Sequence, residues 1–140
     1  QDIIAEEVKF GINKIETYLD FQNKVKEIKY NSVNFLSKLI LEGNKLIAYG
    51  AAAKGNTFLN YCGLGKEFFE CVVDVTPEKQ GLRLPGTLIN IVGEDEISKI
   101  KPDYIVILPW NWKDEISQRL SFTREWGCKL ITLIPEVNVF

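Results

Sequence analysis

The stretch LIAYGAAAKGNT (residues 46–57) decides the fold, because it leads from an apolar strand through small residues into a helix. Residues 46–49 are apolar throughout, which is typical of a strand covered on both faces of a parallel sheet. The loop at residues 50–57 then lies at the carboxyl end of that strand, before a helix expected over residues 57–62. Such loops present free backbone N–H groups and the positive end of a helix, and they attract a phosphate or a carboxylate.

Two nucleotide-binding fingerprints resemble this loop, and each lacks one element. In the dinucleotide pattern GxGxxG the glycines would be Gly50, Ala52 and Gly55, so the middle glycine, which lets a pyrophosphate approach the backbone, is missing. In the P-loop pattern GxxxxGK[ST], Asn56 replaces the phosphate-binding lysine, so ATP hydrolysis is not expected. Either the loop contacts an anion or a nucleotide, or its small residues only let the strand and the helix pack tightly. The candidate contacts in the loop are Gly50, Ala51, Lys54, Gly55, Asn56 and Thr57.

After the first strand, short apolar runs alternate with helical stretches. The expected strands cover residues 46–49, 71–74, 87–92, 104–108 and 130–134, and the expected helices cover residues 57–62, 94–100 and 112–126. This alternation implies right-handed crossovers between parallel strands. The sequence therefore predicts an α/β fold with a Rossmann-like, doubly wound, mainly parallel five-stranded sheet. We expect residues 1–43 to pack on the sheet and to form one domain with the Rossmann-like unit at residues 44–140.

The first third of the chain predicts two helices that precede the sheet. Apolar residues recur at helical spacing through residues 4–39, and the stripe of the second helix is broken only at Ser32. Gly11 is expected to interrupt the pattern, and Thr17, in a sequence that resembles a capping box, is expected to restart it. Gly43 is placed to end the second helix in the left-handed conformation that glycine adopts without penalty.

Polar and aromatic residues at the ends of the other strands are further candidates for ligand contact. Asp74 ends the second strand, where an acid binds ribose hydroxyls in dinucleotide folds, but it could equally cap the following turn. Lys79 and Arg83 lie in the next loop, where they face either a diphosphate or solvent. Trp110 follows the fourth strand and either stacks on a base or sugar or, as we favour, packs against a neighbouring domain. Asn111 can cap the helix after it.

The composition limits the kinds of function. The net charge is −2 without a concentrated basic face, which argues against nucleic-acid binding, and no apolar run approaches the roughly 20 residues of a membrane helix. The chain has no histidine, and its three cysteines show neither a CxxC pair nor metal-site spacing, so we expect reduced thiols in the cytoplasm. No nucleophile has a base beside it, and we assign neither a catalytic residue nor a metal ligand. Because the chain lacks methionine and opens within a helical pattern at Gln1, we expect a fragment of a larger protein.

Several short motifs occur in one order along the chain: AYGAAAKGNT (48–57), LNYCG (59–63), VD (73–74), KQG (79–81), LPGT (84–87), ILPWN (107–111), KDEI (113–116) and REWG (124–127). Together they resemble the C-terminal domain of the S-adenosylmethionine (SAM)-dependent nucleotide-sugar C-methyltransferases, of the sugar 3-C-methyltransferase type. The similarity extends from the N-terminal helices to the last strand.

This resemblance implies a parent enzyme with a zinc-binding N-terminal domain, a central SAM-binding domain and this Rossmann-like unit. Such enzymes methylate a carbon beside the ketone of a nucleoside-diphosphate keto-sugar, as in deoxysugar biosynthesis, by attack of an enolate on the SAM methyl group. The resemblance assigns the base, SAM and structural zinc to the other domains, so this domain alone is expected to be inactive and to hold no cofactor. It assigns contact with the nucleotide-sugar to residues 50–57, including Lys54.

Two other functions stay open from the sequence. The first is a freestanding oxidoreductase domain that binds NAD, although the incomplete GxGxxG pattern counts against it. The second is a docking module without catalytic activity, in which a sheet edge and Trp110 contact a partner domain.

Overall fold

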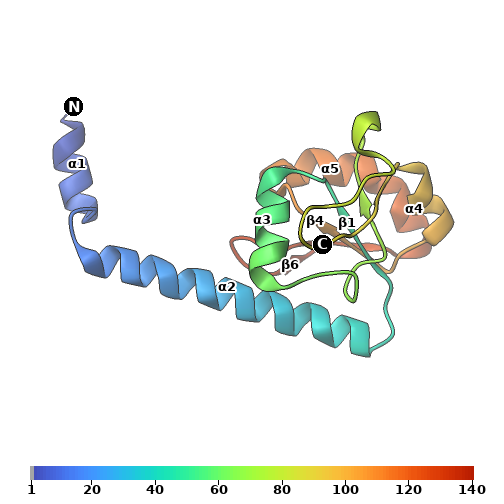
Figure 1. Ribbon diagram of the computed structural model, residues 1–140, viewed down its shortest axis with the longest axis horizontal. Coiled ribbons are helices and arrows are strands. Elements are labelled where there is room, and N and C mark those ends of the chain that lie inside the picture. Colours follow the sequence, from blue (N-terminus) through green and yellow to red (C-terminus); the bar gives the residue numbers. More distant parts are fainter. Residues whose placement is uncertain (1) are drawn as a thin grey trace.

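The computed structural model describes residues 2–140, and its centre is a six-stranded sheet with the order β3-β2-β1-β4-β5-β6 (Figure 1). The strands are β1 (Leu46–Tyr49), β2 (Val72–Val73), β3 (Ile91–Val92), β4 (Tyr104–Ile107), β5 (Lys129–Thr132) and β6 (Asn138–Val139). The first five are parallel, and β6 is antiparallel to β5. This confirms the predicted α/β, Rossmann-like, mainly parallel sheet, with six strands in place of the predicted five. The added strand has only two residues, too few for a periodic pattern in the sequence.

Helices cover both faces of the sheet. The helices of the described chain are α1 (Ile3–Phe10), α2 (Ile15–Leu41), α3 (Ala53–Cys62), α4 (Asp95–Ile100) and α5 (Lys113–Arg119), with short 3₁₀ helices η1 (Pro77–Lys79), η2 (Trp110–Trp112) and η3 (Leu120–Trp126), and α2 to α5 are the ones that pack on the sheet. Neighbouring strand residues point to opposite faces: Ala48 packs in the core with α2 and α3, and Ile47 packs in the core with α4 and α5. The strands are therefore apolar at every position because each face of the sheet is buried.

Three elements differ most from the sequence prediction, and the other boundaries shift by at most two residues. The helix expected over residues 57–62 begins four residues earlier, at Ala53, so residues 53–57 of the predicted binding loop form its N-terminal part. The strand expected over residues 87–92 is reduced to Ile91–Val92, because the chain before it turns back and Arg83 pairs with Asn90 in an isolated antiparallel bridge. The long helix expected over residues 112–126 is divided between α5 and η3.

The N-terminal helices meet at an elbow around Gly11. This residue ends α1 in the left-handed conformation, with φ of +83°, and its N–H donates to the carbonyl groups of Glu7 and Val8. α2 begins at Ile15, so the prediction that Thr17 caps this helix is wrong. The Thr17 hydroxyl instead donates back to the Gly11 carbonyl oxygen at 2.8 Å and fastens the elbow.

Only part of the N-terminal segment packs on the sheet. The buried residues of α2 are Ser32, Leu36 and Leu39, all in its C-terminal half, and Gly43 follows with φ of +83° as predicted. Within residues 2–140, α1 contributes no buried residue. Figure 1 shows α1 and the N-terminal half of α2 projecting away from the body. The expectation that all of residues 1–43 pack on the sheet therefore needs correction for α1 and the first half of α2.

Candidate functional site

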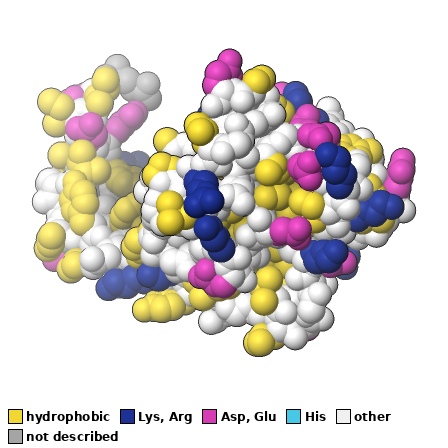
Figure 2. Space-filling model, turned by 45° about the vertical axis from the view of Figure 1, so that its right-hand side comes forward, with side chains coloured by type: hydrophobic (Ala, Val, Ile, Leu, Met, Phe, Trp, Pro, Cys, Tyr) yellow, Lys and Arg dark blue, Asp and Glu magenta, His cyan; other side chains and the backbone are white. Residues whose placement is uncertain are grey.

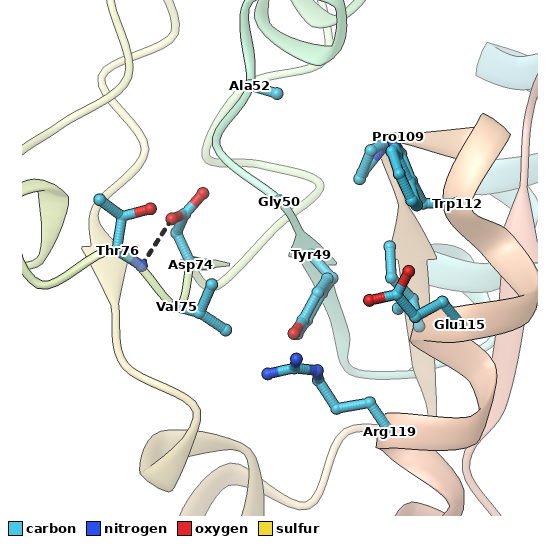
Figure 3. A pocket seen from close by; sticks show the side chains of 11 residues that line it. Tyr49, Gly50, Ala52, Asp74, Val75, Thr76, Pro109, Trp112, Glu115 and Arg119 are labelled. Atoms are coloured by element: carbon cyan, nitrogen blue, oxygen red, sulfur yellow. Dashed lines mark hydrogen bonds between the residues drawn. The ribbon is translucent and has the colours of Figure 1, made fainter.

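A pocket lies at the carboxyl ends of β1, β2 and β4, where the order of the strands reverses (Figure 3). Ligands of open α/β sheets bind at such a reversal, because the chain leaves neighbouring strands in opposite directions and opens a crevice. The pocket has a volume of about 240 Å³. It is lined by Tyr49, Gly50, Ala52, Asp74, Val75, Thr76, Pro109, Trp112, Glu115, Ile116 and Arg119.

Gly50 allows the chain to turn sharply at one wall of this pocket. Its φ is +93°, and a Cβ at this position would lie 2.6 Å from Cδ of Pro109, so no other residue fits without displacement. The chain then enters α3 through Ala52, which is extended, and no side chain in the described part of the molecule caps this helix end. The first N–H groups of α3 are thus free to bind water or an anionic ligand near the pocket.

Asp74 organises the turn on the other side of the pocket. Its carboxylate accepts hydrogen bonds from the backbone N–H groups of Ala51 (2.7 Å) and Thr76 (2.9 Å) and from the Lys79 ammonium (3.2 Å). Burial by itself would raise the pKa of Asp74, but the hydrogen bonds from Thr76, Ala51 and Lys79 outweigh it and hold the pKa below its usual range. Asp74 is therefore a structural anion.

The same contacts change the roles predicted for two neighbouring residues. Lys79 also donates to the Ala51 carbonyl oxygen at 3.0 Å, so its charge fixes the loop between β1 and α3. The Ala51 N–H donates to the Asp74 carboxylate. Neither Ala51 nor Lys79 lines the pocket, so neither is placed there to contact a diphosphate.

A hydrogen bond and an ion pair link three side chains that place a positive charge at the pocket. The Tyr49 hydroxyl donates to Oε1 of Glu94 at 2.5 Å, and Oε2 of Glu94 lies 3.7 Å from the Arg119 guanidinium. Burial, together with the hydrogen bond to Glu94, raises the pKa of Tyr49 well above its usual range, so Tyr49 remains a neutral donor. Figure 3 shows the Arg119 guanidinium next to the Tyr49 hydroxyl. About half of the Arg119 side chain is exposed (48%), so it can meet a ligand.

Sequence reasoning missed Arg119 and its neighbours Trp112 and Glu115. These residues recur at steps of three and four in the segment after β4, the spacing that places side chains on one helix face. That spacing was the available indication that the three residues act together, but it is equally typical of a helix face exposed to solvent. Only the packing of α5 beside the carboxyl end of β1 shows that this face borders a pocket.

Three of the predicted contacts, Lys54, Trp110 and Asn111, lie together beside a second hollow, away from the pocket. Lys54 donates to Oδ1 of Asn111 at 2.9 Å, and its ammonium lies 5.0 Å from the centre of the Trp110 ring. Lys54 and Trp110 line an apolar hollow of about 450 Å³ between α2 and α3, together with Val25, Ala53, Thr57, Phe58 and Tyr61. The predicted residues Gly50 and Asp74 line the first pocket, so the structure divides the predicted site into two places.

The remaining predicted contacts have structural positions. A Cβ at Gly55 would lie 2.6 Å from Cβ of Leu108, so this glycine lets α3 pack closely on β4. The Thr57 hydroxyl donates to the Ala53 carbonyl oxygen, and the Asn56 side chain accepts from Asn60. Arg83 is exposed at the isolated bridge to Asn90. For Gly55, the alternative of tight packing describes the structure better than ligand contact.

The three cysteines are buried and free. Burial raises the pKa of the free thiols of Cys62 and Cys128 to about 11 and of Cys71 to about 12, so these groups are poor nucleophiles at neutral pH. Across residues 2–140, no three His, Cys, Asp or Glu side chains lie close enough to hold a metal ion. None of the helices in the same range is both long and apolar enough to cross a membrane.

Known proteins resemble the chain in sequence along nearly its whole length. Residues 1–135 match the family described as "C-methyltransferase C-terminal domain". C-methyltransferase NovU from Streptomyces niveus is 32% identical over 138 residues, which make up 99% of this chain and 33% of that protein. The chain thus spans about a third of the length of this curated relative. The crystal structure of UDP-D-quinovosamine 4-dehydrogenase from Vibrio fischeri aligns with 66% of this chain and 79% of its own, with a TM-score of 0.48 and 20% identity. The family match confirms the resemblance found in the motifs, and the chain belongs to the C-methyltransferase C-terminal domain family.

Proposed function

We propose that this domain binds the nucleoside-diphosphate keto-sugar of a SAM-dependent C-methyltransferase through the pocket between β1 and β4. One observation carries the proposal: the Arg119 guanidinium, the Trp112 ring and the turn before α3 border a single pocket. The proposed enzyme would work in the cytoplasm, where thiols such as the three free cysteines stay reduced.

The residues of the pocket match the parts of such a ligand. A guanidinium forms strong, charge-assisted hydrogen bonds with phosphate oxygens, and the uncapped N-terminus of α3 adds a second source of positive potential. The Trp112 side chain is 58% exposed and offers an aromatic face to a base or a sugar ring. The volume of about 240 Å³ is below the range of roughly 300–1,000 Å³ usual for small-molecule sites, so the pocket would hold only part of a nucleotide-sugar.

The pocket suits neither NAD nor SAM. In Rossmann-type sites, an acid at the end of the second strand binds the ribose of the adenosine. Asp74 has this position, but its carboxylate is buried and already accepts three hydrogen bonds. Ala52 also replaces the glycine that allows a pyrophosphate to approach. We therefore assign SAM, the catalytic base and the structural zinc to other parts of such an enzyme, and we place no methyl-transfer step in this pocket.

The test is a calorimetric titration of the domain with dTDP, UDP, GDP, NAD and SAM. We expect a nucleoside diphosphate to bind and Arg119→Ala to weaken binding about 10- to 100-fold, because one charge-assisted hydrogen bond contributes roughly 1.5–3 kcal/mol. Arg83→Ala is the matched control, since Arg83 is an exposed cation outside the pocket, and it should leave binding unchanged.

Other outcomes of the titration would contradict the proposal. A loss of affinity in Lys54→Ala but not in Arg119→Ala would move the anion site to the hollow beside Trp110. Binding of NAD would favour the oxidoreductase. If no nucleoside diphosphate binds, the domain does not bind nucleotides on its own.

A further inference from the structure

The two N-terminal helices carry large apolar side chains that no part of the described chain covers. Among them, Ile3, Ile4, Phe10, Ile15, Leu19 and Phe21 are each more than half exposed. Figure 2 shows hydrophobic side chains spread over these projecting helices, behind the body of the molecule. Soluble monomers seldom expose contiguous apolar surface beyond a few hundred Å², and a larger surface marks an interaction site.

This surface has a fixed shape. The Thr17 hydroxyl donates to the Gly11 carbonyl oxygen (2.8 Å), and the Tyr18 hydroxyl donates to the Ile12 carbonyl oxygen (2.6 Å). A Cβ at Gly11 would lie 2.9 Å from the Thr17 oxygen, so the close crossing of the chain depends on this glycine. Both hydrogen bonds hold α1 at one angle to α2, so the exposed apolar side chains of the two helices keep fixed positions relative to one another.

α1 also needs contacts to remain helical. It has eight residues, and it buries none of them within residues 2–140. Isolated helices shorter than about 12–15 residues are marginal in water, and most helical stability in proteins comes from packing an apolar face. A partner that covers this face would supply the missing packing.

The apolar surface continues into the second hollow of the domain. Val25 lies one helical turn after Phe21 in α2, and it lines the hollow of about 450 Å³ with Tyr61 and Trp110. Trp110 stands at the carboxyl end of β4, on the same edge of the sheet as the pocket. A partner that covers α1 and the first half of α2 would therefore extend to the edge where the ligand is proposed to bind.

We propose that this surface, from Ile3 to Phe21 and on to the hollow at Trp110, docks the remaining part of a C-methyltransferase. The chain accounts for only 33% of the length of NovU and belongs to the C-terminal domain family, so about two thirds of such an enzyme lies outside this domain and is available as the partner. Acidic residues such as Glu6, Glu16 and Asp20 are interspersed with lysines along both helices, and a surface that binds anionic membranes would be basic. A protein partner fits these charges better.

The test compares the free 140-residue chain with a hybrid in which this chain replaces the matching third of NovU. Joining the two parts keeps the partner at a high effective concentration and compensates for imperfect complementarity. Hydrogen exchange would be followed at the backbone amides of α1 and the first half of α2. We expect these amides to exchange at least tenfold more slowly in the hybrid than in the free chain.

Matched variants separate docking from a general effect on α2. Phe21→Glu introduces a charge on the docking face and should abolish the protection. Leu41→Glu makes the same change at the far end of α2, where Leu41 is 88% exposed, and should retain it. Equal exchange in the hybrid and the free chain, or protection that survives Phe21→Glu, would overturn the proposal.

Sedimentation of the free chain distinguishes a second copy from the proposed partner. The proposal expects a monomer, and a dimer that dissociates on Phe21→Glu would assign the surface to self-association instead. Because no nucleotide is present, the result does not depend on the ligand proposed for the pocket.

Discussion

Asp74 and Arg119 illustrate how single contacts decide what a charged side chain can do. Both border the same pocket, but Asp74 is 6% exposed and accepts three hydrogen bonds, whereas the Arg119 side chain is 48% exposed and forms an ion pair with Glu94 at 3.7 Å. A charge whose hydrogen bonds are already made stabilises the fold, and a partly exposed cation keeps donors for a ligand. The two residues therefore have different roles at one site.

The structural role of Asp74 predicts a pH-dependent loss of stability in Asp74→Asn. The substitution should lower the free energy of unfolding by about 1–3 kcal/mol at pH 7, because it weakens the hydrogen bonds from Ala51, Thr76 and Lys79. The folded-state pKa of Asp74 lies below the ordinary value of 3.8. A carboxylate of this kind stabilises the protein above that value and loses its contribution as the pH falls through the folded-state pKa.

Urea unfolding at pH 7 and at pH 3 measures this difference between the natural chain and Asp74→Asn. The difference should shrink at the lower pH. Asp95→Asn is the control, because Asp95 forms an exposed ion pair with Lys99 and should change stability little. A pH-independent difference would contradict the role of the Asp74 carboxylate.

At the scale of elements, α2 joins two different environments within 27 residues. Its C-terminal half packs on the sheet through Leu36 and Leu39, and its N-terminal half is exposed. The apolar stripe runs through both halves, so periodicity indicates a buried face without showing what buries it. Ser32 interrupts this stripe at a fully buried position, and its hydroxyl oxygen finds no hydrogen-bond partner among the residues that the structure describes.

This buried hydroxyl predicts that Ser32→Ala stabilises the domain. A buried polar group without a partner is costly, and alanine has the higher helix propensity, so the free energy of unfolding should rise by about 1 kcal/mol. Ser37→Ala provides the control: Ser37 lies in the same helix but is only partly buried, so it gains helix propensity alone. Urea denaturation of the three proteins tests this, and a destabilised Ser32→Ala would show that the hydroxyl has a partner after all.

At the scale of the whole molecule, the stable body and the projecting helices are distinct. Both apolar cores are formed by residues from the C-terminal half of α2 onwards. Figure 1 shows α1 extending away from the sheet and the helices that cover it. The body and the surface proposed for docking can therefore be changed separately.

Deletion of residues 1–14 should leave the stability of the body nearly unchanged. Because α1 buries no residue in the described structure, the free energy of unfolding should change by no more than about 0.5 kcal/mol. The denaturant dependence of that free energy should also stay the same, since it follows the surface that unfolding exposes. Urea denaturation gives both quantities, and a loss above about 2 kcal/mol would show that α1 packs on the body.

The sequence by itself determined the fold class, the order of the elements, the end of α2 at Gly43 and the family. These features depend on local patterns: apolar runs for strands covered on both faces, helical spacing, and a glycine where φ is positive. The same patterns placed Gly50 and Asp74 at the carboxyl edge of the sheet, and both line the pocket.

Only the tertiary structure decided which charged groups are free to bind a ligand. Lys79 and Asp74 neutralise each other beside Ala51, Lys54 turns to Asn111 and Trp110, and Arg119 reaches the pocket from a helix far along the chain. A charge in a sequence has no partner until the chain folds, and the partner determines whether the charge stabilises the protein or meets a ligand. For the same reason the apolar stripe of α1 and α2 predicted helices but not their exposure, since burial depends on which other surfaces are within reach.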